Sequence, residues 1–269
     1  MAHVISADGT AIGYDRLGGD GPALVLVGGG LDDGSENVPL GEHLAAAGFG
    51  VVNYRRRGRG DSGDTQPYAV EREIEDLAAV IDAAGGQAHL FGASSGGALA
   101  LEAAAAGLPV DRIAVHEVPY LVDDEMVAAW RRYVADLDAA LDRADHDEAL
   151  RLFMRLAGSS DDDIAGAQAA PVWSALRELA PTLRYDAACL GDGPPPAPRL
   201  ATVAQPVLLS TGVTMDPHSA GLPIDFFGAG ADAAAACLPD ARRFTVEVAG
   251  HVADPAVVAP RLTEFYRGS

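Results

Sequence analysis

The pentapeptide GASSG at positions 92–96 places Ser94 between two glycines in the spacing G-x-S-x-G. The apolar run AHLFG before it is typical of a buried strand, and a helix rich in small residues follows. A serine at such a sharp strand-to-helix turn presents its hydroxyl as a nucleophile, and the helix start favours negative charge beside it. The alternative is that Ser94 only caps a buried helix, a position that often takes serine. The strand–turn–helix context favours the nucleophile.

A nucleophilic serine needs a general base, and in the chain order serine, acid, histidine the base comes last. Three of the seven histidines precede Ser94, and His146 lies at a polar helix start, where we expect it to be solvated. His251 lies in VEVAGHVADP, directly after the last predicted strand and before the last predicted helix. A loop in that place reaches the carboxyl edge of a parallel sheet. We therefore predict that His251 is the base, against the alternative of a histidine in an ordinary loop.

Two carboxylates are candidates for the acid that orients the histidine. Asp216 follows the predicted strand PVLLSTG, and Glu117 follows the strand after the nucleophile's helix. Either carboxylate could hold the imidazole tautomer and stabilise the imidazolium. Spacing alone leaves both open.

The developing negative charge of an acyl-transfer reaction needs two backbone N–H groups aimed at one point. Ser95, next after the nucleophile, is predicted to supply one. The glycine-rich turn VGGGLDDG after the third predicted strand is predicted to supply the other, from Gly30. Glycines let the backbone come close to a substrate oxygen, although a plain tight turn would have the same sequence.

The segment GRGDSG at 58–63 matches G-x-G-x-x-G, a dinucleotide-binding pattern. That pattern must open a helix at once, but here DTQPY intervenes, with Pro67. We therefore reject a dinucleotide-dependent dehydrogenase. The arginines of 55–59 are expected to form a solvated loop that pairs with nearby acids.

Short apolar runs alternate with helical segments over the first 118 residues, beginning with a hairpin around Asp8-Gly9. This alternation predicts an α/β fold with a mostly parallel central sheet flanked by helices. From about 122 the pattern is helical only, and it ends in the proline-rich GDGPPPAPR before the strand–helix alternation resumes. We predict one core formed by 1–121 and 201–269, with a helical cap at 122–200 inserted after the sixth strand. Such an insertion lies where open α/β sheets bind ligands.

The composition limits the classes of function that the protein could have. Hydrophobic residues make up 49% of the 269 and charged residues 22%, as in a globular protein, and the formal net charge is −20. This acidic balance argues against binding to nucleic acid or to a membrane surface. No signal peptide or membrane-spanning run is evident. The two cysteines, Cys189 and Cys237, fit no zinc or disulfide pattern and suggest a cytoplasmic protein. We expect no metal and no cofactor, and a homodimer remains open.

With these motifs in place, the chain resembles the α/β-hydrolase superfamily over essentially its whole length. Within it, LVGGGLDDG, GASSGG and DRIAVHEVP resemble the zearalenone lactonases, which open a resorcylic macrolactone ring. In those enzymes the acid is a Glu in a His-Glu-hydrophobe-Pro stretch, which HEVP at 116–119 matches. The resemblance therefore favours Glu117 over Asp216.

The resemblance also implies residues that contact the substrate. The lactonases carry a cap tryptophan that packs on the substrate, and Trp173 in APVWSAL occupies a similar place, with ordinary cap packing as the alternative. Gly29 stands where the lactonases have an acid, and we expect Gly29 and Leu31 of the turn to line the substrate site.

We therefore predict a cofactor-free serine hydrolase that cleaves an ester or lactone of an apolar small molecule with Ser94, His251 and Glu117. Two alternatives are a thioesterase or cyclase of secondary metabolism, and a ligand-binding protein on the same fold that does not hydrolyse.

Overall fold

The computed structural model describes residues 2–214, 219–249, 251–252 and 254–268. Its described strands form one eight-stranded sheet in the order β1-β2-β4-β3-β5-β6-β7-β8. The first two strands run antiparallel as a hairpin, β2 is antiparallel to β4, and all remaining pairs are parallel. The strands are β1 Ala2–Ile5, β2 Ala11–Leu17, β3 Ala23–Val27, β4 Gly50–Tyr54, β5 Ala88–Ala93, β6 Val110–His116, β7 Val207–Thr214 and β8 Ala241–Ala249.

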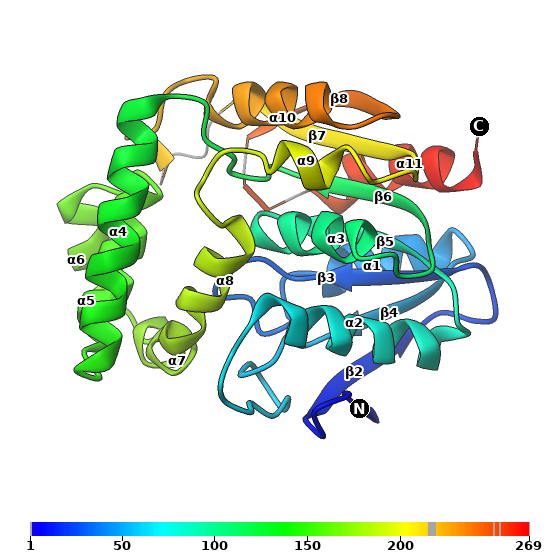
Figure 1. Cartoon of the computed structure of the whole chain (residues 1–269), viewed down its shortest axis with the longest axis horizontal. Helices are drawn as coiled ribbons and strands as arrows, with labels where there is room; N and C mark the ends of the chain where they lie inside the picture. Colours follow the sequence, from blue (N-terminus) through cyan, green and yellow to red (C-terminus); the bar gives the residue numbers. More distant parts are fainter. Residues whose placement is uncertain (1, 215–218, 250, 253, 269) are drawn as a thin grey trace.

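Helices cover both faces of the sheet (Figure 1). On one face α2 and α3 pack through an apolar core that includes Leu77, Leu99 and Leu101. On the other, α1 and α11 pack through a second core that includes Leu44 and Leu262. The mostly parallel sheet between helices confirms the predicted fold class. Apart from the helical layer between β6 and β7 described next, the helices are α1 Val38–Ala46, α2 Val70–Ala84, α3 Ser95–Ala105, α9 Ala197–Leu200, α10 Phe226–Cys237 and α11 Pro255–Arg267.

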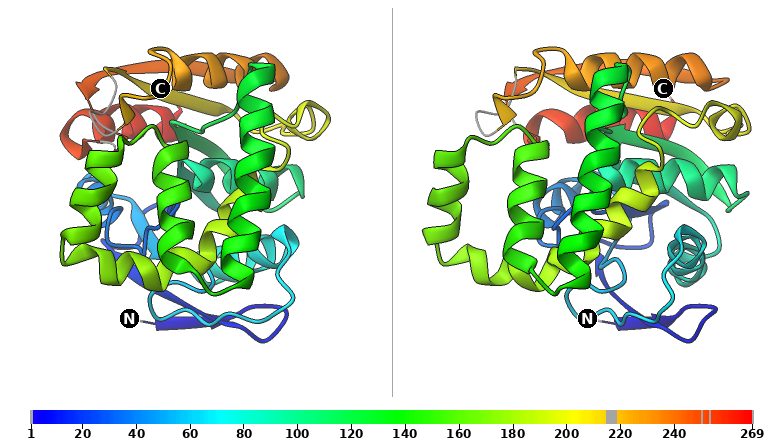
Figure 2. Two further views of the ribbon diagram at one scale, coloured as in Figure 1. Left: turned by 90° about the vertical axis from the view of Figure 1, so that its left-hand side faces the viewer. Right: turned by 60° about the vertical axis from the view of Figure 1, so that its left-hand side comes forward.

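A layer of helices lies between β6 and β7 in the chain and stands at one end of the sheet (Figures 1 and 2). Its helices are α4 Asp124–Asp142, α5 His146–Leu156, α6 Asp161–Ala169, α7 Val172–Leu179 and α8 Leu183–Leu190, with a short 3-10 helix at Ala180–Thr182. This is the helical insertion predicted after the sixth strand. Its apolar side chains, including Trp130, Leu137 and Leu150, continue the core that covers α3. The proline-rich segment that follows contains the short α9.

The arginines of 55–59 do not form a solvated loop, and that expectation is wrong. Arg55, Arg56, Arg57 and Arg59 are each at most 6% exposed. They are buried because each guanidinium meets acids brought from other elements, such as Glu73 on α2, 2.7 Å from Arg56. The arginines do pair with acids, as expected. Because most of these acids come from other elements and are themselves largely buried, the pairs form a buried ionic network.

In the part of the chain that the structure describes, no helix combines the length and the apolar character needed to cross a membrane.

Candidate active site

The strand β5 leads into α3 through a single strained residue. Ser94 has φ 53° and ψ −126°, in a region that non-glycine residues rarely occupy. The residues two positions before and two positions after it are glycines, because there is no room for a side chain at either place. A Cβ on Gly92 would lie 2.5 Å from the carbonyl oxygen of Gly96, and one on Gly96 would collide with the carbonyl oxygen of Val27. This packing holds the serine at the tip of the turn.

The predicted base and one of the two predicted acids are hydrogen bonded. Nδ1 of His251 lies 2.8 Å from Oε2 of Glu117. The other carboxylate oxygen, Oε1, accepts a hydrogen bond of 2.9 Å from the backbone N–H of Gly212 on β7. Glu117 follows β6 directly and is 5% exposed. Both of its oxygens are therefore engaged, and the carboxylate is held in one orientation.

The charge of Glu117 follows from these contacts. Burial alone would raise the pKa of its carboxyl, but the hydrogen bond from His251, the neighbouring His116 and the Gly212 amide outweigh it and lower the pKa. Glu117 is therefore ionised at neutral pH and can stabilise an imidazolium. The other candidate acid, Asp216, lies outside the described residues.

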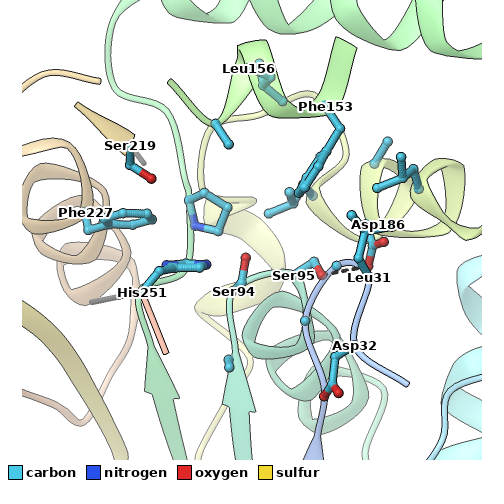
Figure 3. Close-up of a pocket in the computed structure, with 18 of the residues that line it drawn as sticks. Leu31, Asp32, Ser94, Ser95, Phe153, Leu156, Asp186, Ser219, Phe227 and His251 are labelled. Atoms are coloured by element: carbon cyan, nitrogen blue, oxygen red, sulfur yellow. Dashed lines mark hydrogen bonds between the residues drawn. The ribbon is translucent and has the colours of Figure 1, made fainter. Parts of the chain in front are cut away.

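An aromatic ring also packs against the face of the His251 imidazole. Phe227 on α10 stacks on the imidazole, with ring centroids 5.0 Å apart and planes at 21°. Since Nδ1 contacts Glu117, the second ring nitrogen, Nε2, is the one left for proton transfer. In Figure 3 the ring of His251 and the hydroxyl of Ser94 both face the same cavity.

The glycine-rich turn after β3 packs directly against the serine. Because β3 and β5 are parallel neighbours, their carboxyl ends lie together, and a Cβ built on Gly29 would be 3.1 Å from the Cβ of Ser94. Gly29, Gly30 and Leu31 all line the cavity, as does Ser95. These four residues therefore border the same space as Ser94, and their roles as oxyanion donors and substrate contacts stay predictions.

The carboxylate of Asp32 shapes this turn. It accepts hydrogen bonds from the backbone N–H groups of Gly34 and Glu36 and from the side-chain amide of Asn37. Burial raises the pKa of Asp32, an effect that the two backbone hydrogen bonds offset only in part.

Backbone strain gathers at this site. Four described non-glycine residues have positive φ, and three of them are Leu31, Ser94 and Glu117, with φ of 59°, 53° and 49°. Each follows a different parallel strand at its carboxyl end. Such conformations cost about 1–3 kcal/mol each and persist where function requires a side chain to be aimed.

The cavity above Ser94 has a volume of about 540 Å³ and is mostly apolar. Cap helices supply much of its wall, and Figure 3 shows Phe153 and Leu156 of α5 across from the serine. The lining includes Leu31, Asp32, Glu36, Met126, Trp130, Tyr133, Phe153, Arg155, Leu156, Leu176, Asp186, Leu190, Leu222, Phe226 and Phe227.

Trp173, expected from resemblance to contact the substrate, is not among the residues that line this cavity. Its indole N–H donates a hydrogen bond of 2.6 Å to Asp147, and the ring is buried between α7 and α5. Trp130 on α4 is the tryptophan in the cavity wall. Phe153, Phe227 and Asp186 were not foreseen, because a helical pattern shows that a residue is inward but not which cavity it reaches.

No group of three or more His, Cys, Asp or Glu side chains among the described residues is arranged to hold a metal ion. At the serine end, the cavity is lined by Ser94, by His251 with its hydrogen bond to Glu117, and by the glycine turn.

Known proteins share this architecture. An alpha/beta hydrolase from Sphaerobacter thermophilus is 44% identical, with a TM-score of 0.85 over 98% of this chain and 100% of that one. An enol-lactonase from Burkholderia xenovorans (20% identity, TM-score 0.68, 99% of this chain and 98% of that one) and an esterase from Rhodococcus sp. (22%, 0.65, 99% and 97%) share the fold.

A curated relative, an AB hydrolase superfamily protein of Gibberella zeae, is 33% identical over 93 residues. That match spans 34% of this chain and 33% of the relative, about a third of its length. The family model described as the Alpha/beta hydrolase family matches residues 24–261. Because this match covers most of the sequence, the chain belongs to the alpha/beta hydrolase family.

Proposed function

We propose that this protein is a serine hydrolase that cleaves an ester or lactone of an apolar small molecule. The observation that carries the proposal is the hydrogen bond between His251 and Glu117 at the floor of the apolar cavity that Ser94 also lines. A strained serine and an imidazole that line one cavity, with a buried carboxylate hydrogen bonded to the imidazole, are the groups that acyl transfer needs.

In the proposed reaction the Ser94 hydroxyl attacks the substrate carbonyl while His251 takes its proton. Glu117 steadies the imidazolium that forms. The N–H groups of Gly30 and Ser95 hold the negative oxygen of the tetrahedral intermediate. As this intermediate collapses, the C–O bond breaks and His251 returns the proton to the leaving alcohol. Water, activated by His251, then releases the acid and restores the serine.

The cavity supports an apolar substrate. Its volume falls within the range of roughly 300–1,000 Å³ typical of sites for drug-sized ligands, and most of the cap residues that line it are aromatic or aliphatic. The similarity of HEVP at 116–119 and of the glycine turn to the zearalenone lactonases suggests a macrolactone of that type. An enol-lactonase and an esterase among the structural neighbours are consistent with carboxylic ester chemistry.

The test uses mass spectrometry of products from wild type and from Ser94→Ala. The substrates are zearalenone, a series of p-nitrophenyl esters of rising chain length, and an acyl thioester. We expect the wild type to convert zearalenone to a product heavier by one water and to split the p-nitrophenyl esters into p-nitrophenol and the free acid, and we expect Ser94→Ala to do neither.

Hydrolysis of the simple esters with zearalenone left intact would overturn the macrolactone assignment and keep the esterase. Turnover of the thioester alone would favour a thioesterase. Turnover that persists in Ser94→Ala would contradict the proposal as a whole.

A further inference from the structure

A carboxylate from the cap reaches the residues that flank the serine. Asp186 lies on α8 and is 5% exposed. It accepts hydrogen bonds of 2.7 Å from Arg56, 2.8 Å from Arg59 and 2.7 Å from the hydroxyl of Ser95. Figure 3 shows Asp186 joined to Ser95 beside the turn residue Leu31. One cap side chain therefore contacts both the start of α3 and the arginines of the loop at 55–59.

The same two arginines hold the glycine turn. Arg59 donates a hydrogen bond through Nη1 to the carbonyl oxygen of Gly29 while its Nη2 contacts Asp186. Arg56 donates to the carbonyl oxygen of Gly28 at 3.3 Å while it contacts Asp186 through the same nitrogen. Asp186 thus lies behind both guanidiniums that fix this turn.

The direction of the Gly30 N–H follows from the bond to Gly29. The carbonyl of Gly29 and the amide of Gly30 belong to one planar peptide unit, which is trans, so the C=O and the N–H point in opposite directions. Holding the carbonyl oxygen against Arg59 therefore turns the N–H of Gly30 away from the arginine. Gly30 is among the residues that line the cavity.

The second predicted donor is held by the same carboxylate. The N–H of Ser95 is the first of α3, where amides have no partner within the helix. The side chain of Ser95 donates to Asp186, which anchors the residue at the first turn. Both N–H groups assigned to the oxyanion are thus tied to one buried side chain of the cap.

We infer that Asp186 is a positioning residue. Through it the cap holds the backbone N–H groups of the two oxyanion donors, Gly30 and Ser95, in the correct place relative to Ser94. This inference rests on the proposed hydrolase function. It means that the oxyanion site is complete only while α8 is docked on the core.

The charges of Asp186 and its arginine partners allow a positioning role to be distinguished from a purely electrostatic one. Arg56 and Arg59 are balanced by Glu73 and Asp186, and all four side chains are at most 7% exposed. A carboxylate near a developing oxyanion opposes it electrostatically. If charge were all that mattered, the neutral Asp186→Asn variant would react faster. If position matters, it reacts more slowly, because an amide cannot accept hydrogen bonds from both guanidiniums and Ser95 as the carboxylate does.

The experiment measures the rate at which an alkyl fluorophosphonate labels Ser94, together with kcat and KM on an ester and the thermal midpoint of unfolding. In the labelling step the Ser94 oxygen bonds to phosphorus, fluoride leaves, His251 takes the proton, and the P=O oxygen occupies the oxyanion site. Asp76→Asn is the matched control. Asp76 is equally buried and pairs with Arg57 through two hydrogen bonds, and Arg57 makes no hydrogen bond to the glycine turn.

We expect Asp186→Asn to lower the labelling rate and kcat by about 10- to 100-fold with KM little changed, approaching the loss of one oxyanion donor. Asp76→Asn should stay within about twofold of the wild type in rate, although both variants lose thermal stability. If Asp186→Asn does not fold, Ser95→Ala decides, since it removes only the hydroxyl and should slow labelling about 10-fold.

A folded Asp186→Asn that is labelled at the wild-type rate would overturn the inference alone. Equal slowing by Asp76→Asn would do the same, because it would indicate general loosening. A folded wild type that is not labelled at all would overturn the hydrolase proposal along with the inference.

Discussion

The imidazole Nδ1 of His251 lies 2.8 Å from the carboxylate Oε2 of Glu117, although 134 residues separate them in the chain. Glu117 follows β6, the neighbour of the nucleophile's strand, and its second oxygen is held by β7 through Gly212. The carboxylate that orients His251 therefore projects from the end of β6 and is fixed by a hydrogen bond from β7. This arrangement gives the histidine a fixed tautomer and a counter-charge.

The first prediction concerns that carboxylate. Glu117→Gln keeps the shape of the side chain but removes the charge that stabilises the imidazolium, so we expect kcat to fall by about 10⁴-fold. Asp216→Asn serves as the paired variant and should stay near the wild-type rate. Steady-state kinetics on one p-nitrophenyl ester suffice. A large loss in Asp216→Asn with activity retained in Glu117→Gln would reverse the assignment.

The second prediction concerns stability at acidic pH. Burial lowers the pKa of His116 from 6.5 to about 4, so the folded protein resists a proton that the unfolded chain accepts. The free energy of unfolding should therefore decline as the pH falls from 6.5 to about 4. Below that pH, His116 should cause no further decrease. The contribution is about 3 kcal/mol, at about 1.4 kcal/mol per pKa unit.

Urea denaturation of the wild type and of His116→Asn across this range checks the point. Asparagine can replace the contact between His116 and Ser210 but does not titrate. The variant should show a flatter dependence on pH. Parallel curves for the two proteins would mean that another group causes the acid sensitivity.

The third prediction concerns the close packing behind the serine. Gly96→Ala on α3 would force a Cβ against the backbone oxygens of Val27 and Gly28, and we expect it to cost about 3 kcal/mol and to displace the glycine turn. Gly166→Ala on α6 meets nothing within 4 Å and should stabilise the protein by about 0.5–1 kcal/mol. Thermal unfolding distinguishes the two. A harmless Gly96→Ala would show that the turn can yield.

The fourth prediction separates the two tryptophans of the cap. Both are 6% exposed and both donate an indole hydrogen bond, Trp130 to Gly191 and Trp173 to Asp147. Only Trp130 lines the cavity. Trp130→Phe should raise KM several-fold for a bulky apolar ester, whereas Trp173→Phe should leave KM unchanged, and each should lose about 1 kcal/mol of stability. An increase in KM for Trp173→Phe alone would restore its predicted role in substrate contact.

Local patterns were enough to predict most of the fold. Apolar runs of strand length alternate with amphipathic helices, and glycines mark their ends, so the core and the helical insertion follow from short windows of sequence. Ser94 and His251 could be singled out for the same reason, since each lies at the end of a strand in a recognisable local context.

Contacts between distant segments could not be read in this way. The arginines of 55–59 have the local sequence of a solvated loop, and they are buried because acids from several other segments, including β2, α2 and α8, pair with them. Asp186 sits 127 residues from Arg59 in an ordinary helical stretch. Trp173 and Trp130 are chemically alike, and the direction each faces depends on how the cap helices pack.

The most direct test of the central proposal is to find which residue a fluorophosphonate modifies. Wild type, Ser94→Ala and the neighbouring Ser95→Ala are treated with the reagent, and the adduct is located by peptide mass spectrometry. We predict a single adduct on Ser94 in the wild type and in Ser95→Ala, and no adduct in Ser94→Ala. An adduct that persists in Ser94→Ala, or a folded wild type that stays unmodified, would contradict the proposal.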